Sequence, residues 1–245
     1  DVFVGRIPID NSGEVAGMVD KIIDYRENPP PGDWIERLMV WTSVMVPPNG
    51  DTYQSYKDNA FEIHKYLDYR LPPRIDRVYL ADYTETEGGN YQYSDDNFTR
   101  PNAKQQFDAG AGIMSFGGQA FYDESAAPWD NALASYNGVD GISNTWAIAY
   151  NYDDADAANN NGKMPFVFST TCDTLNFSEA DDTNLERWNT KPTGGVIGQI
   201  GNSGRSWRGE FPNNVSRGNW WITDRFWNHF FQMDGRPADA FYETM

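Results

Sequence analysis

Cysteine and histidine are scarce in this 245-residue chain, which has one cysteine, Cys172, and two histidines, His64 and His229. A single cysteine cannot form an internal disulfide, so the fold does not depend on oxidation. Three such side chains cannot build a standard zinc site. The sequence also shows no phosphate-binding loop and no Ser-His-Asp constellation. Any thiol chemistry in this chain therefore depends on Cys172.

Long hydrophobic runs and basic residues are also few. No run reaches the roughly 18 apolar residues that suggest a membrane-spanning helix. The chain has 19 Lys and Arg against 36 Asp and Glu, giving a formal net charge of −17. Such a surface repels nucleic acid and anionic membranes, so we expect neither as a partner. The hydrophobic content of 39% and aromatic content of 15% indicate a globular core.

The segment after Asn11 has the apolar periodicity of an amphipathic helix, with Ser12 as its candidate N-cap and Pro29 to Pro31 ending it. Its apolar residues recur on one helical face, which we expect to pack against the core: Val15, Met18, Val19, Ile22 and Ile23.

Several short, uniformly apolar segments read as buried strands: 36–46, 74–83, 111–116, 165–170 and 193–201. They alternate with predicted helices at 51–71, after Pro101, at 217–233 and at 236–245. Residues 119–164 show little periodicity, apart from 144–150, which could be a strand or a buried turn. This pattern predicts an α/β fold with a mainly parallel sheet covered on both faces. Sites in such sheets gather at the carboxyl ends of the strands, here after Phe116, Ser169 and Ile200.

Four segments resemble, in order, elements of the gingipain family of cysteine peptidases (family C25), which is related in fold to caspases. The opening DVFVGRIPIDNSGEVAGMVDKIIDYRE resembles the strand, Gly-Arg and helix that begin the family's second catalytic subdomain. GAGIMSFGGQ (110–119) resembles the strand leading to the family's Gly-His-Gly. KMPFVFSTTCDTLNF (163–177) resembles the strand that bears the nucleophile. TKPTGGVIGQIGNSGRSW (190–207) resembles the next strand and the substrate-binding loop.

The resemblance implies a caspase-like three-layer α/β sandwich and peptide-bond hydrolysis through a Cys–His dyad, with Cys172 at the nucleophile position. That chemistry needs an available thiolate, an adjacent imidazole and backbone donors for the oxyanion. Ser203 and Trp207 fall in the segment that resembles the substrate-binding loop. We interpret residues 1–245 as a single gingipain-like domain and as a fragment of a longer secreted protein.

The sequence departs from the family pattern where the catalytic histidine should be. Gly117 and Gly118 occupy that position, and glycine can neither accept nor donate a proton through a side chain. The acidic residue that gives the arginine-specific members their preference falls near Tyr56, with Asp58 two residues away. A preference for basic residues therefore does not carry over.

The two histidines elsewhere do not supply an obvious substitute. His64 lies within a predicted helix, and His229 lies between aromatic residues in another. Neither is in a loop at the carboxyl end of a predicted strand. We expect both to be packing residues.

The run NYDDADAANNNG (151–162) raises the possibility of a calcium site, because hard cations prefer several oxygen ligands. Asp154 and Asp156 fit EF-hand spacing but Ala158 does not, so a solvated acidic loop is the favoured interpretation. The same holds for YSDDNF (93–98). The resemblance to gingipains implies a possible structural calcium ion without naming its ligands, and no cofactor is required.

Three hypotheses follow. We predict a degenerate peptidase domain that does not turn over substrate and serves as a structural or binding module of an extracellular or cell-surface protein. Its partners would be a peptide or protein, further domains of the same precursor, or a multimeric surface assembly. The alternative is an active cysteine endopeptidase that uses Cys172 with an unidentified base. The third is an acidic structural protein unrelated to peptidases.

Overall fold

A computed structural model describes residues 5–42, 76–81, 96–97, 100–117, 119–123, 130–136, 146–177, 183–204, 219–232 and 236–244. The chain forms two compact units. We call Ile7–Val44 with Asp76–Arg205 the large unit, and Asp1–Arg6, Met45–Ile75 and Ser206–Met245 the small unit. Cys172 belongs to the large unit.

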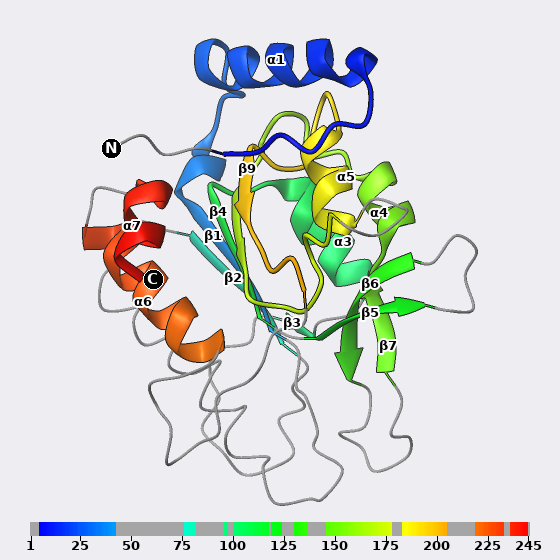
Figure 1. The fold of residues 1–245 in the computed structure, drawn as a ribbon, viewed down its shortest axis with the longest axis vertical. Coiled ribbons are helices and arrows are strands. Elements are labelled where there is room, and N and C mark those ends of the chain that lie inside the picture. The colour runs from blue at the N-terminus through cyan, green and yellow to red at the C-terminus, as the bar shows by residue number, and fades with distance from the viewer. Residues whose placement is uncertain are drawn as a thin grey trace, which may run out of the picture. The chain divides into compact units, whose positions relative to one another are not determined.

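The large unit is built on a six-stranded sheet with the order β3-β2-β1-β4-β8-β9 (Figure 1). Every neighbouring pair in this sheet is parallel, as the alternation of apolar segments and helices predicts. The strands are β1 (Arg37–Thr42), β2 (Asp76–Ala81), β3 (Asp96–Asn97), β4 (Ile113–Gly117), β8 (Phe166–Ser169) and β9 (Gly198–Ile200).

A second sheet follows β4 in the chain and is antiparallel, in the order β5-β6-β7. Its strands are β5 (Gln119–Asp123), β6 (Asp130–Tyr136) and β7 (Trp146–Tyr150). The sequence predicts β7 as a strand or a buried turn, and the strand is confirmed. It does not predict β5 and β6, because their apolar residues are few and lie among Asn, Asp and Gly.

Aromatic side chains form the core between the parallel sheet and helices α3 (Arg100–Ala109), α4 (Tyr152–Ala157) and α5 (Asn184–Thr190). Phe107 of α3 stacks on Trp188 of α5 with ring centroids 4.6 Å apart, and Trp41 of β1 contacts both rings. Leu38 and Val40 of β1, which point to the opposite face of the sheet, are buried too. Both faces of this central strand are therefore covered, as predicted.

Helix α1 (Ser12–Glu27) forms where the sequence predicts it, but it buries a different face. Only Met18 and Lys21 are buried, and the N-cap is Asn11 rather than Ser12. Four of the five residues expected to pack are 42–46% exposed instead: Val15, Val19, Ile22 and Ile23. The short helix η1 (Asp33–Glu36) connects α1 to β1.

The small unit contributes two helices to the described residues, α6 (Asn219–Gln232) and α7 (Pro237–Thr244), which pack against each other. Phe226, Trp227 and Phe230 of α6 are buried and in mutual ring contact, so the predicted aromatic amphipathic helix is confirmed. The predicted helix at 51–71 lies outside the described residues. No helix in the described part of the chain is long and apolar enough to cross a membrane.

Candidate active site

The ends of β4 and β8 lie side by side at the same edge of the parallel sheet. The two strands pair in register, with Phe116 opposite Ser169. Beyond the last pair, the Thr170 N–H donates a hydrogen bond to the Phe116 carbonyl over 3.3 Å. The segment after Phe116 and the segment after Ser169 therefore leave the sheet together. Two of the three strand ends selected from the sequence are adjacent.

Cys172 lies in the loop that follows β8 and is partly exposed. Threonines fix this loop through short-range hydrogen bonds. The Thr171 N–H donates to Ser169 Oγ over 3.2 Å, and Thr174 Oγ1 donates to the Thr171 carbonyl over 3.2 Å. Thr183 Oγ1 donates to the Thr174 carbonyl over 2.7 Å. Because these threonines are buried, the loop holds Cys172 at a fixed place where the residue is partly exposed.

The segment after β9 runs beside the Cys172 loop and is bonded to it. Asn202 Nδ2 donates to the Thr171 carbonyl over 3.1 Å, and the Asn202 carbonyl accepts the Leu175 N–H over 2.9 Å. The Gly204 carbonyl accepts the Asp173 N–H over 3.0 Å. All three predicted strand ends thus meet around Cys172, as the parallel-sheet rule predicts.

The close approach of these two segments limits the residues that fit between them. A Cβ atom on Gly201 would lie 3.0 Å from both Thr174 Oγ1 and Leu175 Cδ1. Asp173, the residue after the cysteine, has a φ of 53°, a left-handed conformation that non-glycine residues adopt rarely and Asp more readily than most. The backbone therefore turns sharply at the cysteine.

Gly117 ends β4 next to this loop and has no side chain to offer. Among the described residues, no heavy atom lies within 4 Å of a Cβ atom added there. A side chain at this position would therefore displace none of the described neighbours. Gly118 lies outside the described residues.

Of the other residues that the sequence predicts for the site, only one lies within the described residues. Ser203 is exposed in the segment after β9, between two residues that bond the Cys172 loop. Tyr56, Asp58 and Trp207 lie outside the described residues. Their substrate-binding roles remain predictions.

The two histidines both belong to the small unit. His64 lies outside the described residues, and His229 is partly exposed on α6. The large unit, which holds Cys172, has no histidine anywhere in its sequence.

The residues that sequence reasoning missed are those that shape the Cys172 loop, above all Asn202, Thr174 and Thr183. A usable signal was present, because short polar side chains such as Ser, Thr and Asn commonly bond nearby backbone in turns. The bond from Asn202 to Thr171 joins residues 31 positions apart in the sequence, which no local pattern reveals.

The acidic stretch at 151–162 is not the solvated loop that the sequence favours. It begins with α4, whose N-cap Asn151 forms a reciprocal capping box with Asp154. Asp154 is buried and pairs with Arg100 Nε at 2.8 Å and Lys104 Nζ at 3.1 Å. Asp156 pairs with Arg187 at 3.0 Å. Within the described ranges, no three His, Cys, Asp or Glu side chains are grouped so that they could hold a metal ion.

A parallel α/β sheet with a cysteine loop at its carboxyl edge is the architecture of caspase-like cysteine peptidases. A family model described as Peptidase family C25 matches residues 1–245. The chain belongs to this family.

Solved structures with the same fold include gingipains. The Arg-specific cysteine proteinase gingipain R is similar with a TM-score of 0.63 and 14% identity, over 99% of this chain and 49% of that chain. The complex of the pro- and mature domains of Porphyromonas gingivalis RgpB is similar with a TM-score of 0.64 and 15% identity, over 100% of this chain and 51% of that chain. A structure described as a protease gives 0.56 and 13% identity, over 97% and 52%.

These structural matches establish a caspase- and gingipain-like α/β fold. The chain spans about half the length of each of these structures. Among curated proteins, no sequence matches the chain.

Proposed function

We propose that this chain is a degenerate C25 peptidase domain that keeps the nucleophile position but does not hydrolyse peptide bonds. The observation that carries the proposal is Gly117. It follows the Phe116–Ser169 pair at the strand end next to the start of the Cys172 loop, and it offers no imidazole. Its segment resembles the one that carries the family's histidine, and such an imidazole is the group that activates the thiol for attack. Loss of one member of a catalytic unit typically lowers the rate by several orders of magnitude.

The domain then serves as a structural or binding module for a peptide or protein. The Cys172 loop supports this role, because its buried threonine bonds and its contacts with Asn202 keep a site in place at the carboxyl edge of the sheet. An extracellular or cell-surface location accords with the net charge of −17. Its partners would be further domains of the same precursor or members of a multimeric surface assembly.

The alternative function is an active cysteine endopeptidase that uses Cys172 with a base not yet identified. The partial exposure of Cys172 favours it, since a purely structural cysteine is usually buried. The two functions differ in the reactivity of this thiol.

A thiol-reactive peptide probe distinguishes them. We expect the probe to label Cys172 only weakly near neutral pH, because a glycine at position 117 offers no imidazole to activate the thiol. The Cys172→Ala variant is the blank. Efficient labelling near neutral pH, together with Cys172-dependent peptide turnover, would establish the endopeptidase instead.

A matched pair of variants tests the role of the open position. Gly117→His and Gly118→His each place an imidazole at one of the two registers, and Gly117→Gln is a control of similar size without a titratable group. We expect one histidine variant to gain labelling near neutral pH and the glutamine variant to gain none. Equal labelling of all variants and the original chain would remove Gly117 and Gly118 as the cause of inactivity.

A structural calcium ion is a separate proposal, which rests on the resemblance to gingipains and on no ligand set in the described residues. If an ion is bound, chelation with EGTA should lower the melting temperature of the folded chain, and added calcium should restore it. An unchanged melting temperature removes the proposal.

A further inference from the structure

Helix α1 presents an apolar stripe to solvent, formed by Val15, Val19, Ile22 and Ile23. Each of these side chains is 42–46% exposed. Their spacing of i, i+4, i+7 and i+8 places them on one helical face over two turns. This is the pattern of side chains with which amphipathic helices anchor protein partners. We call these four residues the α1 stripe.

The stripe is exposed although α1 is firmly attached to the rest of the large unit. The neighbouring face of α1 is anchored at three successive turns. At Gly17 the helix passes close to Pro192, since a Cβ atom added there would lie 3.4 Å from the proline Cγ. Lys21 Nζ donates to the carbonyls of Trp188 and Asn189 over 3.2 and 2.8 Å. At the next turn the Tyr25 ring meets the Trp34 ring edge-on, with centroids 5.9 Å apart. The anchoring fixes the rotation of α1 about its axis and leaves the stripe outward.

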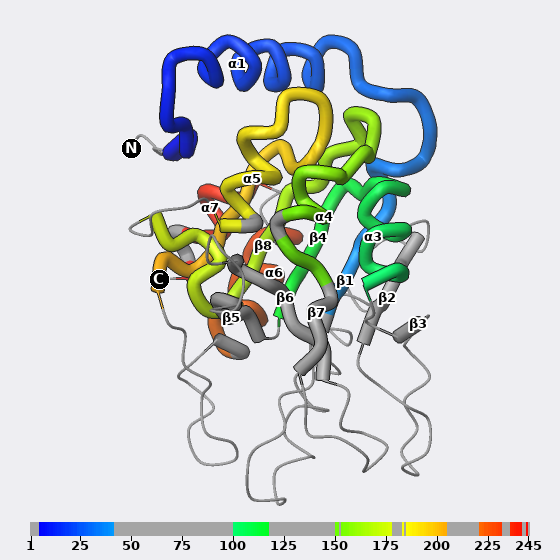
Figure 2. Tube along the Cα trace, turned by 90° about the vertical axis from the view of Figure 1, so that its right-hand side faces the viewer, coloured from blue at the N-terminus to red at the C-terminus, as the bar shows by residue number. Residues whose placement is uncertain are grey.

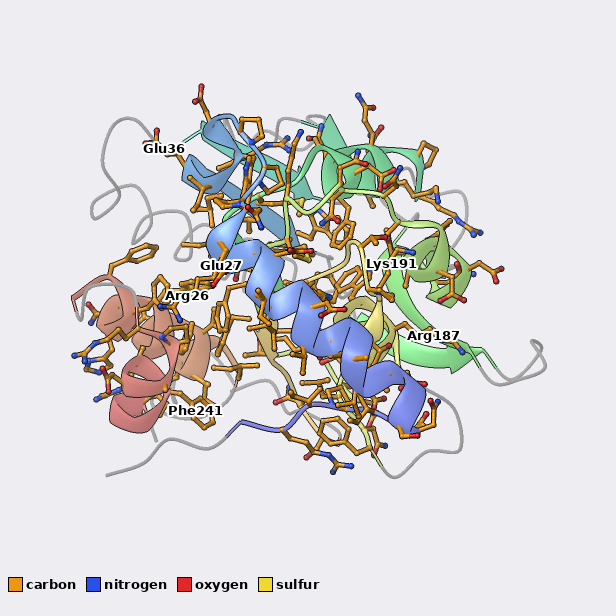
Figure 3. The ribbon with its side chains drawn as sticks, turned by 90° about the horizontal axis from the view of Figure 1, so that it is seen from above. Arg26, Glu27, Glu36, Arg187, Lys191 and Phe241 are labelled. Atoms are coloured by element: carbon orange, nitrogen blue, oxygen red, sulfur yellow. The ribbon has the colours of Figure 1, made fainter. Side chains whose placement is uncertain are left out.

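Carboxylates border the stripe along one side. At about 100° per residue, Glu27, Asp20 and Asp24 follow Ile23 around the helix and occupy the arc between the stripe and Gly17. All three are exposed. Arg26 lies in line with the stripe at the carboxyl end of α1, next to Glu27 (Figure 3). The face therefore combines an apolar strip with a negative margin.

A second copy of the chain is a poor occupant of this face. Each copy carries a formal charge of −17, and pairing two stripes would also bring two acidic margins together. The area that four side chains on one helix can bury is small compared with the total of roughly 1,200–2,000 Å² that stable protein–protein interfaces bury. A basic partner gains from the same charges by electrostatic complementarity.

We propose that the α1 stripe docks an amphipathic helix of a protein partner, with Lys or Arg beside its apolar face. Helix α1 lies at the end of the parallel sheet where the strands begin (Figure 1, Figure 2). It contacts η1 just before β1 and the end of α5 just before β9. Cys172 lies at the opposite, carboxyl edge. Docking at α1 is therefore independent of any activity at Cys172.

The test uses the full chain and a fluorescein-labelled synthetic amphipathic peptide with Leu on one helical face and Lys along its border. A peptide of the same composition in scrambled order, and one with Glu in place of Lys, are the peptide controls. The stripe variant is Val19→Gln with Ile22→Gln, which leaves the charge unchanged. The matched control is Ile35→Gln, because Ile35 is 59% exposed on η1 and outside the stripe.

We expect the Lys peptide to bind the original chain and the Ile35→Gln variant equally, and the stripe variant at least about tenfold more weakly. Asp20→Asn with Asp24→Asn should weaken binding less and flatten its dependence on salt. Equal binding to the original chain and the stripe variant, or equal binding of the scrambled peptide, would show that the stripe does not hold the peptide and would overturn the proposal. So would a concentration-dependent dimer in sedimentation analysis that the stripe variant abolishes.

Discussion

Gly117 and the Cys172 loop lie at the ends of neighbouring strands. Cys172 has the residue type of a cysteine-peptidase nucleophile, whereas Gly117 has no side chain that could act as its base. The cysteine loop is fully built, with buried threonines and a bonded companion segment after β9. Gly117 has no side chain, and no described heavy atom lies within 4 Å of a Cβ atom added there. Under the proposed function, the loss of an imidazole beside this loop is enough to abolish turnover, because catalysis depends on both groups together.

Gly195 shows the opposite case, a glycine that the fold requires. Its φ is +77°, and a Cβ atom there would lie 1.9 Å from the Trp188 carbonyl oxygen. The Gly195 N–H and carbonyl also bond the buried Asn160 side chain over 3.0 and 2.8 Å. We therefore expect Gly195→Ala to lower the free energy of unfolding by about 2 kcal/mol or more.

Urea denaturation measures this loss, and Gly117→Ala is its matched control. Because nothing lies within 4 Å of the added Cβ at Gly117, that variant should stay within about 0.5 kcal/mol of the original chain. Similar stability of the two variants would contradict the close approach at Gly195.

At the scale of elements, the attachment of α1 depends on a buried amine. Burial, and to a lesser degree the charge of Lys191, lowers the pKa of Lys21 from 10.5 to about 7. A neutral amine still has two N–H groups for the carbonyls of Trp188 and Asn189. Between pH 7 and 10.5 the unfolded chain therefore binds a proton at this residue that the folded chain does not.

Stability attributable to Lys21 should therefore rise with pH across this window. The free energy of unfolding of the original chain, minus that of Lys21→Met, should increase from about pH 7 to about pH 10 by up to about 4 kcal/mol. Subtracting the free energy of unfolding of Lys21→Met removes the contribution that all other titrating groups make to the pH dependence. A difference that falls with pH would mean that the folded state favours the charged amine.

An acidic residue of helix α4 stabilises its first turn and links the helix to α3. Asp154 both caps the helix and pairs with two cations of α3, Arg100 and Lys104. These cations are 42% and 37% exposed, so solvent screens the pairs and the cap supplies a large part of the effect.

We expect Asp154→Ala to cost about 1–2 kcal/mol of unfolding free energy. Asp156→Ala removes a carboxylate that is 57% exposed and should cost less than about 0.5 kcal/mol. Thermal unfolding of both variants at low and high salt checks this. An equal cost for the two would contradict the capping role of Asp154.

The sequence predicts five of the six parallel strands, because their apolar runs are short, continuous and bounded by turns. It misses β3 (Asp96–Asn97), two polar residues within the stretch 93–98 that it favours as a solvated acidic loop. It also places the site, since parallel strands end at one edge. It fails at α1, because periodicity marks Val19 and Ile22 as apolar but cannot show which face meets Pro192 and Trp188. It fails again at Asp154, whose burial depends on Arg100, far away in the sequence.

At the scale of the whole molecule, fold and family are shared with gingipains at 14–15% identity. A sheet of buried apolar strands tolerates wide sequence change while its topology persists. Catalysis does not, because it requires particular groups at particular positions. The large unit of this chain keeps the topology and the cysteine and has no histidine.

The most direct test of the proposed inactivity is peptide turnover by the full chain. It is measured on a degenerate fluorogenic peptide library near neutral pH, with Cys172→Ala as the blank. We predict that the original chain and the Cys172→Ala variant release product at the same background rate. Product release by the original chain that disappears in Cys172→Ala would contradict it.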